Sequence, residues 1–395
     1  AAHVGVIRYL EEHQIPIDYI AGTSMGAIVG GMYASGMSPD EMEAELAAMD
    51  WADMFNDSPG YKDLSFRRKQ DIAADLFNME LGIKGYKIHM PGGLITGQKV
   101  RFKMQTLTLH TEGIDSFDDL SIPFRALATN IETGKLVVLS RGNLAEAIHA
   151  SFAIPGVINP VEIEGQLLVD GGLVSNVPVN TVRDMGADVV IAVHVGSNLT
   201  SRSGLSNFAA VTKQMIDLTL YNNVANELPG ADIVIMPYLE GFGSADFEKT
   251  PDIVPRGEYA AELTSEILKQ LRLSHTEYLS VMAHRDTPRK QLPENIDFLE
   301  VYNRSSVSDR WIIENIDTQV SQPFDLEKLK RDLGWLYQTN EFSLIDFHLV
   351  NRGEVTGLTI SAQEKPWGND TLRFGLSLQD NFQGDSFYNL NCRYT

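Results

Sequence analysis

Ser24 is the residue of this sequence whose setting most favours chemistry. It lies at the centre of the pattern Gly22-Thr23-Ser24-Met25-Gly26, between an apolar stretch (17–21) typical of a strand and a small-residue run (27–34) typical of a helix. A serine on a sharp strand-to-helix turn is held in a strained conformation with its hydroxyl exposed, and glycines two residues to either side let both elements pass closely. The pattern predicts a nucleophile elbow.

Asp170 is the candidate base for this serine. The sequence Asp170-Gly171-Gly172 follows an apolar run (166–169), which places the carboxylate at the end of a strand. A serine hydroxyl needs a base to become a nucleophile at neutral pH. Asp-Gly-Gly is also a common turn, and by itself the turn is the better interpretation. Combined with the elbow, the pattern favours a catalytic aspartate.

The chain resembles the patatin-like phospholipases over about residues 1–285. The resemblance is carried by the elbow, by residues 150–156 (ASFAIPG), by Asp170-Gly171-Gly172 with the later Asn176 and Pro178, and by residues 185–188 before a strand. It implies a Ser-Asp dyad that cleaves lipid acyl esters, with Ser24 as the nucleophile and Asp170 as its base. It also implies that the oxyanion hole comes mostly from a glycine-rich loop upstream of Ala1.

A Ser-Asp-His triad is the competing arrangement, because His194 would complete the chain order Ser-Asp-His. His194 lies inside the apolar run 189–195, which favours a core histidine. His149 stands near the end of a short helix, where the helix dipole explains a positive charge. His3, on the first helix, is a weaker catalytic candidate. The sequence therefore favours the dyad and leaves a triad esterase as the alternative.

Composition limits the partners of the chain. With 395 residues it is long enough for two or three domains, and its net charge of −21 argues against nucleic acid and against a basic patch for anionic lipid. The single cysteine, Cys392, excludes an internal disulfide. The sequence contains no apolar run of about 18 residues or more, so it predicts no transmembrane helix. No metal-ligand or phosphate-binding motif is present, so we expect no metal and no cofactor.

Residues 1–285 alternate between helices and short apolar strands, which predicts an α/β layered domain with a largely parallel sheet. The expected strands are 124–129, 136–139, 189–195 and 233–236. Capping boxes predict helices that begin after Ser38 and Ser274, and a further helix is expected over 258–271. Residues 286–294 are polar, contain two prolines and indicate a linker.

Residues 295–366 change to the order β-α-α-β-β, with elements expected at 296–302, 309–317, 326–337, 342–350 and 355–364. This α+β order resembles a POTRA domain, the periplasmic module found before outer-membrane β-barrels. In residues 367–395, apolar and polar residues alternate on either side of a polar turn. The first hairpin of an outer-membrane barrel gives this pattern, and so does an ordinary soluble hairpin.

The combination resembles the patatin-type autotransporters of Gram-negative bacteria. It implies a phospholipase A or lysophospholipase at the outer membrane or cell surface, with a passenger that is displayed or secreted. The expected partners are a phospholipid or other acyl-ester lipid, the membrane surface, and a second copy in a possible homodimer. A catalytically silent outer-membrane passenger is a further alternative, and the intact Ser24 and Asp170 argue against it.

Two other segments have open interpretations. The basic run Arg67-Arg68-Lys69 indicates a solvated face or, less favoured, a contact to a lipid headgroup. The apolar stretch 76–81, followed by glycines at 82 and 85, is compatible with a mobile lid over an acyl-chain pocket and equally with a buried helix.

Overall fold

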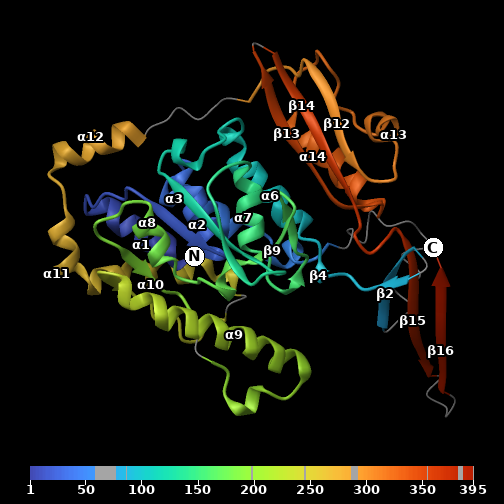
Figure 1. Ribbon diagram of the computed structural model, residues 1–395, viewed down its shortest axis with the longest axis horizontal. Coiled ribbons are helices and arrows are strands. Elements are labelled where there is room, and N and C mark those ends of the chain that lie inside the picture. Colours follow the sequence, from blue (N-terminus) through green and yellow to red (C-terminus); the bar gives the residue numbers. More distant parts are fainter. Residues whose placement is uncertain are drawn as a thin grey trace. The chain divides into compact units, whose positions relative to one another are not determined.

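The computed structural model describes residues 1–57, 77–85, 87–196, 199–243, 246–285, 292–353, 355–380 and 386–394 (Figure 1). The chain forms two compact units, one of Ala1–Phe55 with Lys99–Gln291 and the other of Asn56–Gln98 with Leu292–Thr395. Within the described ranges, no helix combines the length and the apolar character that crossing a bilayer requires.

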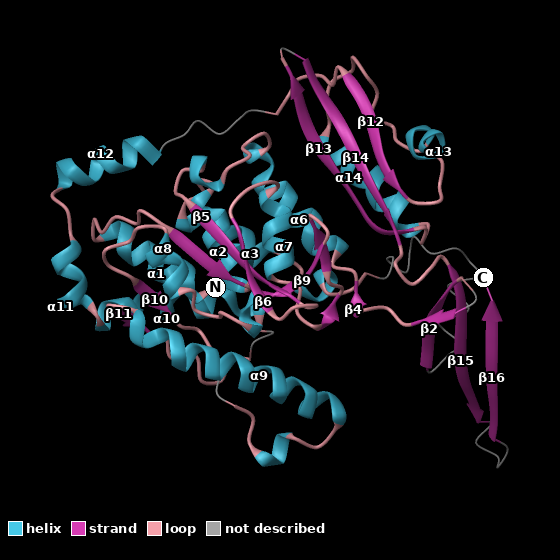
Figure 2. Cartoon of the chain, in the orientation of Figure 1, coloured by secondary structure: helices cyan, strands magenta, loops and turns pink. Residues whose placement is uncertain are grey.

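The first unit is built on a five-stranded sheet (Figure 2). Strands β1 (Ile20–Thr23) and β5 (Phe124–Asn130) run parallel, as expected for an α/β domain. Strands β6 (Lys135–Leu139), β9 (Gln166–Asp170) and β8 (Val161–Ile163) are added antiparallel, a feature that their apolar pattern did not predict.

A separate parallel pair joins β10 (Ile191–Val193) to β11 (Ile233–Ile235), and β7 (Gly156–Ile158) is a short further strand. All four strands expected from the sequence are present, although β10 is shorter than the apolar run that predicted it. His194 follows the last residue of β10, so it stands at a strand end and not inside the strand.

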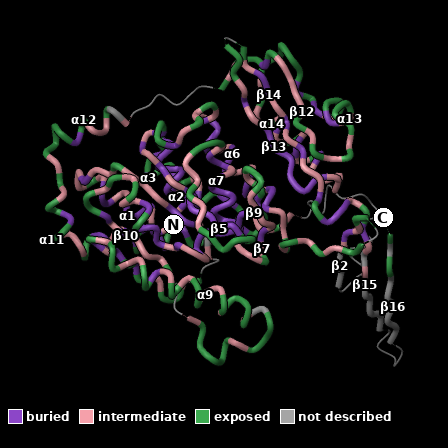
Figure 3. The backbone as a smooth tube through the Cα atoms, in the orientation of Figure 1, coloured by how far each residue is buried: buried purple, intermediate pink, exposed green. Residues whose placement is uncertain are grey.

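The helices of the first unit pack around these strands, and Figure 3 shows the buried backbone concentrated around β5, α2 and α7. The helices are α1 (Ala2–Glu12), α2 (Met25–Ala34), α3 (Pro39–Ala48), α4 (Trp51–Met54), α6 (Gln98–Thr108), α7 (Leu144–Ser151), α8 (Val179–Asp184), α9 (Phe208–Glu227), α10 (Thr250–Leu263), α11 (Ser265–Leu268) and α12 (His275–Arg285).

Both predicted capping boxes are confirmed. Ser38 begins α3 by accepting the N–H of Glu41 while its own N–H donates to the Glu41 carboxylate, and Ser274 with Glu277 does the same before α12. The single helix expected over 258–271 is wrong in its bounds. Helix α10 begins at Thr250 and ends at Leu263, and the side-chain hydroxyl of the next residue, Thr264, donates to the Ala261 carbonyl.

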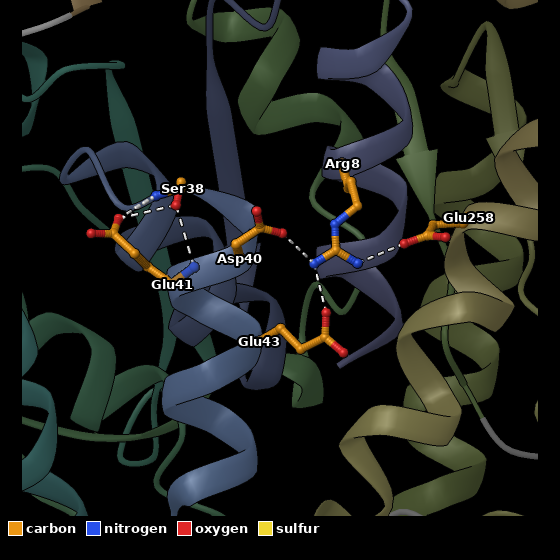
Figure 4. Close-up of polar contacts among 6 residues, drawn as sticks. All are labelled: Arg8, Ser38, Asp40, Glu41, Glu43 and Glu258. Carbon is orange, nitrogen blue, oxygen red and sulfur yellow. Dashed lines mark hydrogen bonds and ion pairs between the residues drawn. The ribbon is translucent and has the colours of Figure 1, made fainter.

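Helix α1 packs very closely against α10 because a glycine of each helix lies against the backbone of the other. A Cβ at Gly257 would lie 1.9 Å from the Ala2 carbonyl oxygen, and one at Gly5 would lie 2.0 Å from that of Val254. Arg8 on α1 bridges Asp40 and Glu43 on α3 to Glu258 on α10 (Figure 4). These ion pairs hold the three helices together.

The second unit contains the predicted β-α-α-β-β order. The elements are β12 (Phe298–Arg304), α13 (Asp309–Glu314), α14 (Leu326–Gln338), β13 (Phe342–Arg352) and β14 (Val355–Glu364). Strand β14 is central, parallel to β12 and antiparallel to β13. Asp325 caps α14 by accepting the N–H of Lys328.

The predicted C-terminal hairpin is present as β15 (Asp370–Asp380) and β16 (Ser386–Tyr394). It continues into a four-stranded antiparallel sheet through β2 (Phe77–Lys84) and β3 (Lys87–His89), while β4 (Gly93–Ile95) stands apart from that sheet.

The stretch expected to be a lid or a buried helix is therefore a strand, because its backbone bonds to β15. For the same reason, residues 56–98 group with the second unit and not with the α/β domain. The basic run Arg67-Arg68-Lys69 lies outside the described residues.

Candidate active site

Ser24 occupies the turn between β1 and α2 in a strained conformation. Its backbone has φ 56° and ψ −122°, in a region that residues with a side chain rarely adopt. Two side chains hold this turn: the Ser24 N–H donates to the Ser151 hydroxyl at 3.0 Å, and the Thr23 hydroxyl donates to the Ser175 carbonyl at 2.8 Å. This is the backbone of a nucleophile elbow.

The two glycines of the elbow differ in what requires them. A Cβ at Gly22 would lie 2.3 Å from the Gly26 carbonyl oxygen, so the close pass of strand and helix excludes a larger residue there. A Cβ at Gly26 would meet nothing nearer than the Nε2 atom of His3, at 4.0 Å. The steric expectation is confirmed for Gly22 and wrong for Gly26, where only the backbone takes part in the close contact.

Asp170 ends β9 and begins the turn that follows it. Its backbone N–H donates to the Ala153 carbonyl at 2.9 Å, and its carboxylate accepts the Gly172 N–H at 2.8 Å. Gly171 is required because a Cβ there would lie 2.3 Å from the Leu127 carbonyl oxygen on β5. Gly172 is also tightly packed, because a Cβ there would lie 3.0 Å from the side-chain oxygen of Asn176.

The structure brings Ser24 and Asp170 together. Asp170 is 8% exposed, and its carboxylate interacts with the Ser24 side chain. Burial raises the pKa of Asp170 to about 6, although the interactions with the Ser24 side chain and the Gly172 N–H act in the opposite direction. A carboxylate whose pKa lies near neutrality, close to a serine side chain, is suited to act as a general base.

The segment 150–156 connects the two residues, a role that its sequence did not reveal. Ser151, fully buried at the end of α7, accepts the N–H of Ser24, and two residues later the carbonyl of Ala153 accepts the N–H of Asp170. One short segment therefore fixes the backbone of both candidate catalytic residues.

Sequence reasoning also missed two residues of α9 that hold the turn after Asp170. The Asn223 side chain donates to the carbonyls of Gly172 and Leu173, at 3.0 and 2.8 Å. The Glu227 carboxylate accepts from the Ser175 hydroxyl and from the N–H of Val177. No local pattern marks these positions, because their partners lie about fifty residues away in the chain.

The histidines considered for a triad occupy different places. His194 is half-buried, and the contacts described for it are with Ile235, Gly196 and His3. His3 is close to the elbow, and burial lowers its pKa to about 3. Burial also lowers the pKa of His194, so both imidazoles are neutral at pH 7. His149 is buried in the last turn of α7, as a helix-end position.

Comparison with known proteins assigns this part of the chain to a class. The family model for patatin-like phospholipases matches residues 1–183, a range that includes both Ser24 and Asp170. This part of the chain is therefore similar to the patatin-like phospholipases, which supports a lipid ester hydrolase.

Three curated relatives show the range of proteins that share this domain. A patatin-like phospholipase domain-containing protein of Caenorhabditis elegans is 34% identical over 199 residues, 50% of this chain and 13% of the relative. An uncharacterized NTE family protein of Mycobacterium tuberculosis is 34% identical over 197 residues, 50% of this chain and 46% of that protein.

Lysophospholipase NTE1 of Mycosarcoma maydis is 34% identical over 199 residues, 50% of this chain and 9% of the relative. The domain thus has NTE-family homologues, and the chain spans less than half the length of each of these relatives.

Proposed function

We propose that this protein hydrolyses carboxylic esters of phospholipids or lysophospholipids through a dyad of Ser24 and Asp170. The observation that carries the proposal is a strained elbow serine whose side chain interacts with a buried carboxylate, the pKa of which is raised to about 6. The match of residues 1–183 to the patatin-like phospholipases supports lipid esters as the substrate class.

In the proposed reaction, the Ser24 oxygen attacks the ester carbonyl while Asp170 takes the hydroxyl proton. The tetrahedral intermediate collapses by breaking the bond to the alcohol, and Asp170 returns the proton to that leaving oxygen. Water then attacks the acyl-enzyme with Asp170 again acting as base, which releases the fatty acid and restores the serine.

The backbone N–H of Met25 is a candidate donor to the oxyanion. It follows the nucleophile directly and belongs to the first turn of α2, whose N–H groups have no acceptor within the helix. The same N-terminus carries the positive end of the helix dipole, which favours the negative charge that forms on the substrate oxygen.

The dyad is tested by measuring phospholipid and short-chain ester hydrolysis, together with labelling by a fluorophosphonate. We expect Ser24→Ala and Asp170→Asn each to reduce turnover by about 1000-fold or more, with the adduct located on Ser24 by mass spectrometry. Ser203→Ala, at an exposed serine, is the matched control and should retain labelling and turnover.

The triad alternative is tested in the same assay by His194→Ala. Because no described contact of His194 involves Ser24 or Asp170, we expect this variant to keep most of its activity. A folded His194→Ala protein that loses turnover as completely as Ser24→Ala would replace the dyad by a triad. A wild-type chain that is folded, unreactive to the label and inactive on every ester would support the silent passenger.

We propose for the second unit that it is a POTRA-like module followed by the first hairpin of an outer-membrane barrel. The β-α-α-β-β order and the β15–β16 hairpin support this assignment. The lipid hydrolase domain would then be displayed at, or secreted from, the surface of a Gram-negative cell. We expect the protein to fractionate with the outer membrane, and we expect added protease to cleave the hydrolase domain on intact cells. Recovery of the protein only from the cytosol would refute this assignment.

A further inference from the structure

Helix α9 exposes an apolar face to solvent. Five of its large apolar residues are exposed, at 87%, 44%, 65%, 41% and 58% of their surface, and the helix is drawn largely as exposed in Figure 3. They are Phe208, Val211, Met215, Leu218 and Tyr221. Their spacing of three or four residues places them along one side of the helix at about 100° per residue. We call this surface the α9 apolar face.

The opposite side of α9 carries the turn of the candidate base. Asn223 donates to the carbonyls of Gly172 and Leu173, Val224 is buried, and the Leu220 side chain would contact a Cβ at Gly172 at 3.4 Å. The helix therefore joins an exposed apolar surface directly to the backbone next to Asp170.

The charges of α9 indicate what kind of surface covers the apolar face. Its only lysine, Lys213, is paired with Asp217, and its terminal Glu227 is engaged by Ser175 and Val177. The five apolar side chains thus form an uncharged surface on a chain whose net charge is −21. An anionic membrane would repel such a chain, whereas a neutral lipid surface accepts apolar side chains without an electrostatic cost.

We propose that the α9 apolar face docks on a neutral, zwitterionic lipid surface and so brings the Asp170 turn to the interface where the substrate lies. The proposal deepens the proposed function, since it names the physical form of the substrate. Docking itself needs no reaction at Ser24, so the two proposals are tested separately.

The test is cosedimentation of the chain, carrying Ser24→Ala to keep the lipid intact, with phosphatidylcholine vesicles. We expect the triple variant Phe208→Ser, Met215→Ser and Leu218→Ser to bind these vesicles at least about tenfold more weakly. Binding should be insensitive to salt and should not tighten when phosphatidylglycerol is added.

The matched control replaces three exposed apolar residues outside α9, namely Tyr259, Leu263 and Ile267, which are 57%, 70% and 52% exposed. This variant should bind phosphatidylcholine like its parent. The proposal would be overturned if the α9 triple variant bound as tightly as its parent, or if the control variant lost as much binding as the α9 triple variant. Tighter and salt-sensitive binding to anionic vesicles would also overturn it.

A second copy of the chain is the other possible occupant. Sedimentation velocity without lipid distinguishes it: a concentration-dependent dimer that the α9 triple variant abolishes would overturn lipid docking. Hydrolysis of a short soluble ester by the wild-type chain is measured in parallel. Its absence would refute the proposed function, while vesicle binding by the Ser24→Ala chain would still decide the docking proposal.

Discussion

Replacing Asp170 by Asn should abolish activity and at the same time stabilise the fold. Burial raises the pKa of this carboxyl from 3.8 to about 6, so the folded state holds its proton more tightly than the unfolded state does. The folded protein therefore loses stability as the pH rises from about 4 to 6, and two pKa units correspond to about 3 kcal/mol at pH 7 or above. An asparagine is neutral at every pH and avoids this cost while its oxygen can still accept the Gly172 N–H.

The assay is pulse proteolysis across a urea series, in which peptides of the first unit are followed separately because a chain of two units need not unfold in one step. At pH 8 we expect Asp170→Asn to raise the free energy of unfolding by up to about 3 kcal/mol, and at pH 4 the gain should disappear. Replacing Asp232 by Asn is a control for which we expect the opposite change in the free energy of unfolding.

Hydrogen bonds from Val190 and Arg183 lower the pKa of Asp232, so its charged form is the stabilising one. Asp232→Asn should therefore lower stability at pH 8, and this effect should fade as the pH falls through the range in which the carboxylate is protonated. If the Asp170→Asn gain were equal at pH 4 and pH 8, or if the variant were less stable at pH 8, the argument from burial would be refuted.

Three further predictions concern the backbone and the base. Gly171→Ala should destabilise the first unit by about 1–3 kcal/mol or more, because its Cβ would lie 2.3 Å from the Leu127 carbonyl oxygen. Gly26→Ala should be tolerated or stabilising. Thermal unfolding of the two variants tests this difference. In the wild-type chain, kcat/KM for a soluble ester should fall below about pH 6, where Asp170 becomes protonated, and a flat profile down to pH 4 would contradict its role as base. Asn223→Leu should lower kcat more than it changes KM and should move this acidic limit to higher pH. The reason is that a shifted turn weakens the hydrogen bond from the Gly172 N–H to the Asp170 carboxylate. An unchanged pH profile would show that Asn223 has only a structural role.

The elements that short-range sterics and hydrogen bonds specify could be predicted from the sequence. The elbow around Ser24 depends on a few adjacent residues, and the capping boxes at Ser38 and Ser274 form within four residues of chain. The β-α-α-β-β order of the second unit and the hairpin that ends the chain follow from periodicity and turns in the same way. Local sequence is sufficient here because both partners of each interaction lie within it.

Tertiary structure decided the features whose partners are distant in the chain. The segment that forms β2 is a strand because it pairs with β15, although its apolar pattern was also compatible with a lid or a helix. The raised pKa of Asp170 depends on burial beneath several elements, and the support of its turn by Asn223 depends on a helix that begins far downstream. Such features depend on desolvation and on backbone hydrogen bonds between remote segments, which no local pattern of residues encodes.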